Sequence, residues 1–164
     1  MCNYTYIMNP APPTIDGLAE LNQCTCLNLR QAARVVTQHY EALLDPVGIK
    51  ITQLPILAAL AAGPLTMNHL ADRLAMDRTT LTRNLRPLAR DALLRIERGY
   101  DKRERRVQVT EAGLAALRRA VPLWKQAQAE MIDNLGRFQW GVLMDNLRAT
   151  VQAAKHNTVR GRGK

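Results

Sequence analysis

Aromatic residues and cysteines are both scarce in this sequence of 164 residues. Phe, Trp and Tyr together make up 4%, and the three cysteines are too few, and odd in number, for the disulfide framework of a small secreted domain. No apolar run approaches the roughly 18 residues that a membrane-spanning helix needs. The first residues lack the charged start and the apolar stretch of a secretory signal. These absences argue against a secreted or membrane protein, and we expect a cytoplasmic one.

Aliphatic residues and positive charge are what the sequence has in abundance. Hydrophobic residues make up 47%, and the wealth of Ala and Leu favours helices over sheets in a single globular domain. The formal net charge of +9 resides in two segments. Residues 66–106 hold eleven Lys/Arg against six Asp/Glu, and residues 155–164 hold four Lys/Arg and no acid. Basic charge confined in this way predicts a polyanionic partner.

The order of local patterns predicts a mainly α fold with one small β-hairpin. Residues 1–14 contain three prolines and are expected to form a flexible arm, and residues 155–164 a basic, disordered tail. Between them, hydrophobic spacing and turn residues predict helices over residues 16–44, 52–62, 66–74 and 77–91, strands over residues 94–98 and 105–109, and helices over residues 110–135 and 139–154. The expected helix caps are Thr52, Thr66, Asp77 and Thr110.

The two short helices in the middle of the chain form a basic pair. Only residues 75–77 separate them, and helices joined by so tight a turn pack at a steep angle, as in a helix-turn-helix. The outer face of the second helix offers Arg, which bonds guanine O6 and N7, and Thr, which bonds phosphates and touches thymine methyl groups. A solvated basic face without a partner is the alternative. We predict that this motif binds double-stranded DNA through Thr66, Asn68, Arg78, Thr79, Thr80, Thr82, Arg83 and Arg86.

The hairpin that follows is slender and strongly basic. It cannot bury its guanidinium groups, and beside a recognition helix it would lie along the DNA backbone and insert an Arg into the minor groove. Asp101 stands two residues before Arg103 and either holds that guanidinium or serves only as a turn former. The expected DNA contacts of the hairpin are Arg98, Asp101, Lys102, Arg103 and Arg105.

From about Leu18 to Ala154 the chain resembles the MarR family of bacterial transcription regulators. The segment DKRERRVQVTEAG is similar to the wing signature of that family, through Asp101, Arg103, Val107, Val109, Thr110 and Gly113. The resemblance implies a winged helix-turn-helix fold and a homodimeric regulator, usually a repressor, on a near-palindromic operator. It also implies release from DNA by a small molecule or an oxidant. One departure is Ala92, where the family usually has Gly before the first wing strand.

Apolar stripes on the outer helices also predict the homodimer. One stripe follows a spacing of three and four residues along the first long helix, through Cys26, Leu29, Ala33, Val36, Tyr40 and Leu43. Because the chain has no further domain to cover such stripes, we expect a two-fold partner to bury them. The expected division is therefore a helical dimerisation region in residues 15–48 and 111–154, and a winged helix-turn-helix lobe in residues 49–110.

Two cysteines on the first predicted helix raise the possibility of redox sensing. Cys24 and Cys26 would point about 200° apart on a continuous helix and could not readily form a disulfide with each other. Cys26 and Tyr40 resemble, by position, the cysteine and one tyrosine of the organic-hydroperoxide-sensing branch of the family, in which the tyrosine comes from the partner subunit. Arg30 replaces an aromatic residue there, and its guanidinium could turn toward the sulfur. The alternative is a cysteine that merely packs as a small hydrophobe.

Two functions of other classes are alternatives to a regulator. An enzyme is not expected, because the sequence shows no glycine-rich phosphate loop, convincing catalytic triad, metal-ligand cluster or cofactor motif. A non-specific architectural DNA-binding protein would share the basic charge, and it differs from a regulator in having an affinity independent of sequence.

Overall fold

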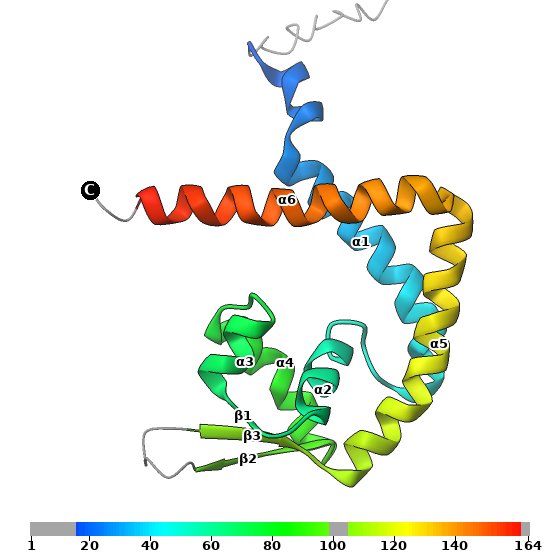
Figure 1. Ribbon diagram of the computed structural model, residues 1–164, viewed down its shortest axis with the longest axis vertical. Coiled ribbons are helices and arrows are strands. Elements are labelled where there is room, and N and C mark those ends of the chain that lie inside the picture. The colour runs from blue at the N-terminus through cyan, green and yellow to red at the C-terminus, as the bar shows by residue number, and fades with distance from the viewer. Residues whose placement is uncertain (1–15, 99–104, 162–164) are drawn as a thin grey trace, which may run out of the picture. The chain divides into compact units, whose positions relative to one another are not determined.

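The computed structural model describes residues 16–98 and 105–161. It divides into two compact units, one up to Val36 and one from Thr37 onward, which are taken separately below. Among the described residues, no helix combines the length and the apolar character that crossing a membrane requires. Figure 1 shows the elements in chain order.

The first unit contains a short 3-10 helix, Leu18–Gln23, followed by the start of α1, Thr25–Leu44. The single long helix expected over residues 16–44 is therefore wrong, because Cys24 takes an extended conformation (ψ 116°) between the two. The Asn28 side chain stabilises this break, since its Nδ2 donates to the backbone oxygens of Asn22 (2.8 Å) and Cys24 (3.0 Å). Cys24 thus lies outside α1, and the argument that set the two cysteines about 200° apart on one helix does not apply.

In the second unit, α2 spans Leu54–Ala61 after a 3-10 turn at Asp45–Val47. Its N-cap is Gln53, not the expected Thr52. The reason is a turn that precedes the helix, in which Gln53 Oε1 accepts a hydrogen bond from the Lys50 backbone amide at 3.0 Å. Pro55 then falls in the first helical turn, where a missing N–H costs no intrahelical bond.

The helix-turn-helix forms as the sequence predicts. Helix α3 spans Met67–Arg73 and α4 spans Arg78–Arg90. Thr66 caps α3 by accepting from the His69 amide at 3.2 Å, and Asp77 caps α4 by accepting from the Thr80 amide at 2.8 Å. Both caps satisfy backbone donors that a helix start leaves without an intrahelical partner.

Three short strands form an antiparallel sheet in the order β1-β3-β2. The hairpin strands β2, Leu94–Arg98, and β3, Arg105–Val109, match the predicted ranges. The additional strand β1, Leu65–Thr66, was not predicted, because two residues carry no periodicity and its pairing with β3 is long-range. This strand joins the start of α3 directly to the hairpin.

A core of aliphatic side chains holds the lobe together. The Leu residues of α3 and α4 point inward, toward α2 and the central strand β3. The largest fully buried members are Leu44, Ile56, Leu57, Leu60, Leu70, Leu81, Leu85, Leu88 and Val107. Because one face of α4 is committed to this core, its opposite face is left to solvent.

Two long helices complete the chain. Helix α5 spans Glu111–Leu135, with Thr110 as the predicted cap, and α6 spans Arg137–Gly161. The expectation of a disordered tail from residue 155 is wrong as far as Gly161. The reason is that extending a helix of several turns is far easier than nucleating one, and no proline or glycine intervenes between residue 155 and Gly161.

The junction between the hairpin and α5, formed by Ala92, Leu93, Thr110 and Gly113, is closely packed. Thr110 Oγ1 donates to the Ala92 carbonyl oxygen at 2.7 Å, and the Thr110 amide donates to that of Leu93 at 3.1 Å. Ala92 has a φ of +55°, a left-handed conformation that favours glycine. This turn explains why the family usually has glycine at that position, and the alanine retains the conformation at some cost in strain.

Candidate nucleic-acid interface

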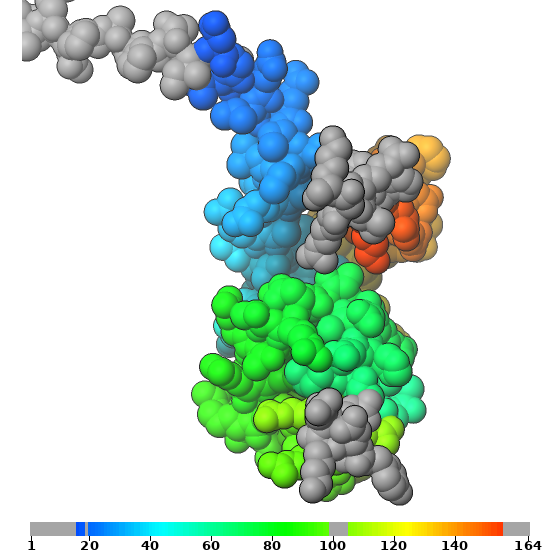
Figure 2. All heavy atoms as spheres, turned by 90° about the vertical axis from the view of Figure 1, so that its left-hand side faces the viewer, coloured from blue at the N-terminus to red at the C-terminus, as the bar shows by residue number. Residues whose placement is uncertain are grey.

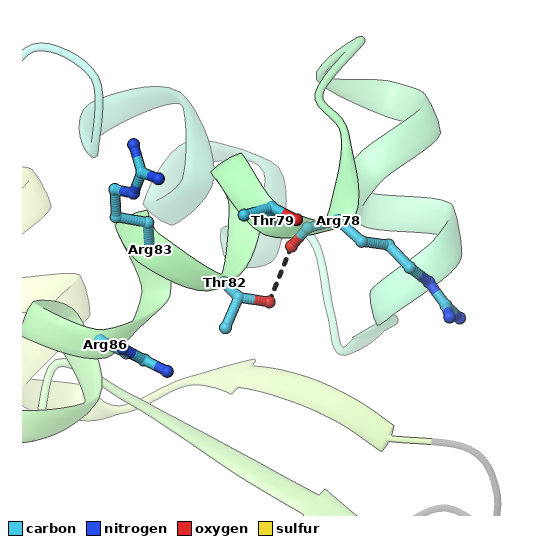
Figure 3. Close-up of a pocket in the computed structure, with 5 residues that line it drawn as sticks. All are labelled: Arg78, Thr79, Thr82, Arg83 and Arg86. Atoms are coloured by element: carbon cyan, nitrogen blue, oxygen red, sulfur yellow. Dashed lines mark hydrogen bonds between the residues drawn. The ribbon is translucent and has the colours of Figure 1, made fainter.

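The exposed face of α4 forms an open basic concavity (Figure 3). Its volume is about 340 Å³, and its lining consists of Arg78, Thr79, Thr82, Arg83 and Arg86. These side chains are exposed, whereas Leu81, Leu85 and Leu88 on the other face are buried. Sequence periodicity predicted this division, and the structure brings together every predicted α4 contact except Thr80.

Thr80 is committed to the helix cap. Its hydroxyl donates to Asp77 Oδ2 at 2.6 Å, while its amide donates to Oδ1. These hydrogen bonds, with that of the hydroxyl the largest cause, lower the pKa of Asp77 below its ordinary value. The stabilising effect of the cap is therefore present at neutral pH and is lost as the pH falls through this lowered pKa. Thr80 accordingly positions the start of α4 and has no hydroxyl proton left to donate to a base.

The Thr82 hydroxyl is also engaged within the helix, because it donates to the Arg78 carbonyl oxygen at 2.7 Å (Figure 3). Its methyl group and its acceptor lone pairs remain available on the exposed face. This bond leaves Thr82 suited to contact with a thymine methyl rather than to donation to a phosphate.

The basic side chains that line this concavity fall into two kinds. The guanidinium groups of Arg83 and Arg86 form no hydrogen bond or ion pair within residues 16–98 and 105–161. By contrast, Arg78 donates from Nε (3.1 Å) and Nη2 (2.5 Å) to Oδ1 of Asn68 on α3. The sequence offered no signal for this bond, since it joins residues ten positions apart across a turn. The concavity therefore combines one fixed cation with two that have no partner in the described chain.

The hairpin has two chemically different faces. Arg98 lies opposite Arg105 in the register, beyond the pair of exposed Ile96 and buried Val107 on the same face. Neither guanidinium group has a hydrogen bond or ion pair in the part of the chain that the structure describes. On the other face, Arg95 Nε lies 3.1 Å from an Oε1 of Glu97. Among the described residues of the hairpin, the guanidinium groups of Arg98, Arg105 and Arg106 thus form no ion pair, and Arg98 and Arg105 border a concavity of about 260 Å³.

Three predicted contacts at the hairpin tip, Asp101, Lys102 and Arg103, lie outside the described residues. Thr66 lies at the start of α3, where its hydroxyl oxygen accepts the capping bond. Strand β1, which ends at Thr66, pairs with β3. Figure 2 shows the helix-turn-helix (green) adjoining the strands that lead to the tip (yellow-green).

The residues predicted for sensing have different environments. Cys26 and Arg30 lie exposed on α1, and Cys24 is half-buried at the break before it. Tyr40 is buried, its hydroxyl donates to Gln128 Oε1 at 3.0 Å, and burial raises its pKa above the ordinary value. The Tyr40 hydroxyl proton is thus already used within the chain. Among the described residues, no group of three His, Cys, Asp or Glu side chains could hold a metal ion.

The fold and this basic surface define a winged-helix nucleic-acid-binding protein, and comparison with known proteins gives its family. The MarR family model matches residues 47–104. The transcriptional regulator MosR of M. tuberculosis, solved in complex with DNA, is 41% identical, with a TM-score of 0.75 over 81% of this chain and 97% of that one. An uncharacterized HTH-type transcriptional regulator of Bacillus subtilis, YwoH, is 26% identical over 57% of this chain and 69% of that protein. A mutant of E. coli MarR complexed with operator DNA shares the fold, with 22% identity and a TM-score of 0.70 over 79% of this chain and 96% of that one. The chain belongs to the MarR family of winged-helix transcriptional regulators.

Proposed function

We propose that this protein is a homodimeric repressor that binds a near-palindromic DNA operator in a sequence-specific manner. The observation that carries the proposal is the exposed face of α4, on which Arg83 and Arg86 have no partner among the described residues. Exposed arginines without counter-charges, on a helix whose opposite face is buried, are suited to guanine edges in the major groove. The 41% identical regulator MosR was solved in complex with DNA, which supports the same partner here.

The wing supplies the second part of the interface. Like charges directly opposite each other in a sheet destabilise it, and Arg98 and Arg105 form such a pair. Backbone phosphates would supply the missing negative charge and hold the hairpin along the duplex. Insertion of Arg103 into the minor groove, with Asp101 and Lys102 beside it, stays a prediction.

The dimer is supported by apolar side chains that a single chain leaves exposed on α6. Phe138 is 77% exposed and Val142, one turn later, is 45% exposed. A large apolar surface of this kind marks an interface in soluble proteins. Together with the exposed apolar residues at the start of α1, it supports residues 15–48 and 111–154 as the dimerisation region and residues 49–110 as the DNA-binding lobe. Release from DNA by a small ligand stays a prediction, and so do the cytoplasmic location and the absence of enzymatic activity.

Selection from a random duplex pool tests the proposal most directly. We expect the wild type to enrich one near-palindromic sequence and to bind it at least a thousandfold more tightly than a scrambled duplex, since specific sites usually exceed non-specific ones by about that factor. The Phe138→Asp/Val142→Asp variant should dissociate on dilution and lose operator binding, because its lobes no longer bind two half-sites together. Equal affinity for operator and scrambled duplex would indicate the architectural alternative, and a wild type that stays monomeric at all concentrations would exclude the two-fold arrangement.

A thiol-based redox switch of the organic-hydroperoxide type is the second candidate, favoured by the exposure of Cys26 at the start of α1. An accessible thiolate attacks a hydroperoxide, so that the thiol becomes a sulfenic acid and the peroxide leaves as an alcohol. Because the Tyr40 hydroxyl donates to Gln128, Tyr40 would first have to exchange that partner for a sulfur.

Cumene hydroperoxide distinguishes this candidate from release by a ligand. If the redox switch is correct, cumene hydroperoxide should release the wild type from its selected duplex, and a thiol reductant should restore binding. The Cys26→Ser variant should stay bound in the presence of the oxidant. Cys24→Ser serves as the matched control. Release of Cys26→Ser by the same oxidant dose would eliminate Cys26 as the sensor.

A further inference from the structure

The start of the DNA-reading helix contains one arginine that the protein itself holds in place. Asn68 Oδ1 accepts from both Nε and Nη2 of Arg78, at 3.1 Å and 2.5 Å. Figure 3 shows the Arg78 side chain extending away from Arg83 and Arg86. Thr82, through its bond to the Arg78 carbonyl oxygen, also fixes the backbone of the same residue. Arg78 is therefore restrained at both its main chain and its side chain.

We propose that Asn68 is a positioning residue, which acts on DNA through Arg78 and fixes the direction in which that guanidinium presents its free edge. The proposal rests on the proposed function of α4 as the reading helix. A guanidinium carries five N–H groups in one plane. The bonds to Asn68 use the N–H of Nε and one N–H of Nη2. The opposite, end-on edge of the guanidinium stays free, and there one N–H of Nη1 lies parallel to the remaining N–H of Nη2. This edge takes a pair of acceptor atoms, either O6 and N7 of a guanine or two oxygens of a phosphate.

The location of the pair favours positioning over a contribution to stability. Both side chains are exposed, and a solvent-exposed hydrogen bond between side chains adds little to the free energy of unfolding. Arg78 is also the first residue of α4, where the partial positive charge of the helix does not favour a cation. The amide oxygen of Asn68 nevertheless restricts the Arg78 side chain before DNA binds. Arg78 therefore loses less rotamer freedom on binding. Arg83 and Arg86 have no such restraint in the described chain, so the three arginines should differ in how sharply they discriminate.

A double-mutant cycle on the wild-type-selected duplex tests the proposal in the full-length protein. We expect Asn68→Ala to weaken binding about three- to tenfold, as loss of one ordered side chain would, and Arg78→Ala about ten- to a hundredfold. The double variant should bind no more weakly than Arg78→Ala alone. Asn68→Ala combined with Arg83→Ala should show independent, multiplicative losses. The thermal midpoint should be the same for all variants, since none removes a buried group.

Asn68→Asp provides the conservative variant. It keeps an oxygen that holds Arg78, so if that edge reads a guanine, Asn68→Asp should retain the base preference at the Arg78 position even though its charge weakens overall binding near phosphates. Asn68→Ala should flatten that preference. A loss for Asn68→Ala that persists in full in the Arg78→Ala background would overturn the proposal, because Asn68 would then contact DNA directly.

Binding to modified duplexes distinguishes whether Arg78 takes its pair of acceptor atoms from a guanine or from a phosphate. If Arg78 binds guanine, 7-deazaguanine at one position of each half-site should weaken the wild type but not Arg78→Ala. If Arg78 binds a phosphate, no single base replacement should affect the wild type differently from Arg78→Ala. The Arg78→Ala variant should then lower the salt dependence of binding by about one counterion per protomer. A wild type that binds no DNA would reject the proposed function and this inference together. A selective wild type with an additive Asn68–Arg78 cycle would reject the inference alone.

Discussion

Replacing Gly113 by alanine is expected to lower the free energy of unfolding by about 3 kcal/mol or more, at the upper end of the cost of overpacking. A Cβ atom at this position would overlap the Leu93 carbonyl oxygen and would lie 2.7 Å from Cγ2 of Val109. Neither neighbour can retreat easily, because the Leu93 oxygen accepts from the Thr110 amide and Val109 belongs to β3. A typical domain is stable by only about 5–15 kcal/mol, so a loss of this size should be evident in urea denaturation followed by circular dichroism.

Gly141→Ala is the matched control. It makes the same change within α6, where a Cβ would meet no atom of the described residues within 4 Å beyond its chain neighbours and the backbone of its own helix. Alanine in such a helical position should stabilise the protein by up to about 1 kcal/mol. If Gly113→Ala unfolded at the same urea concentration as the wild type, the close approach of α5 to Leu93 would not exist in solution.

The second large effect is expected from the wing. Arg98→Ala/Arg105→Ala should weaken DNA binding at physiological salt by about thirtyfold per protomer, and so by about a thousandfold for a symmetric dimer, if each arginine neutralises one phosphate. The plot of log affinity against log salt concentration should become shallower by about two per protomer for the same reason. Stability should stay the same or rise slightly, because the variant removes two like charges that lie opposite each other.

A charge-matched variant separates this contact from a general effect of net charge. Arg119→Ala/Lys125→Ala also removes two positive charges, but from exposed positions on α5 that do not line the concavities of α4 and the wing. We expect its salt dependence to stay close to that of the wild type in fluorescence anisotropy titrations. Equal losses for the two double variants would show that long-range attraction, and not phosphate contact by the wing, governs affinity.

Local signals account for the parts of the fold that the sequence predicts well. Thr66, Asp77 and Thr110 all cap the helices expected of them, because a short polar side chain that bonds an amide three residues later depends on neighbours in sequence alone. The hairpin strands likewise follow from a local alternation of residues. The exposed basic face of α4 followed directly from the positions of its three buried leucines.

The features that could not be predicted depend on groups distant in sequence or on competition between neighbours. Strand β1 exists because β3 pairs with it, and the Asn68–Arg78 bond exists because two helices meet at a particular angle. At Cys24, the Asn28 side chain offers the backbone an alternative to helical hydrogen bonds, and periodicity carries no sign of that competition. The apolar stripe of α1 was predicted correctly as a pattern, but only Tyr40 among its members is buried within one chain.

The length of α5 has a mechanical consequence. Only Thr110 separates the wing strand β3 from this helix, which spans 25 residues, or about 37 Å at the usual rise, with Pro122 in its interior. A tilt of about 5° at the end near α6 would move the end near the wing by about 3 Å, roughly the length of one hydrogen bond. In the proposed homodimer, a small angular change between the two protomers would therefore move the wing arginines relative to the phosphates by about that distance.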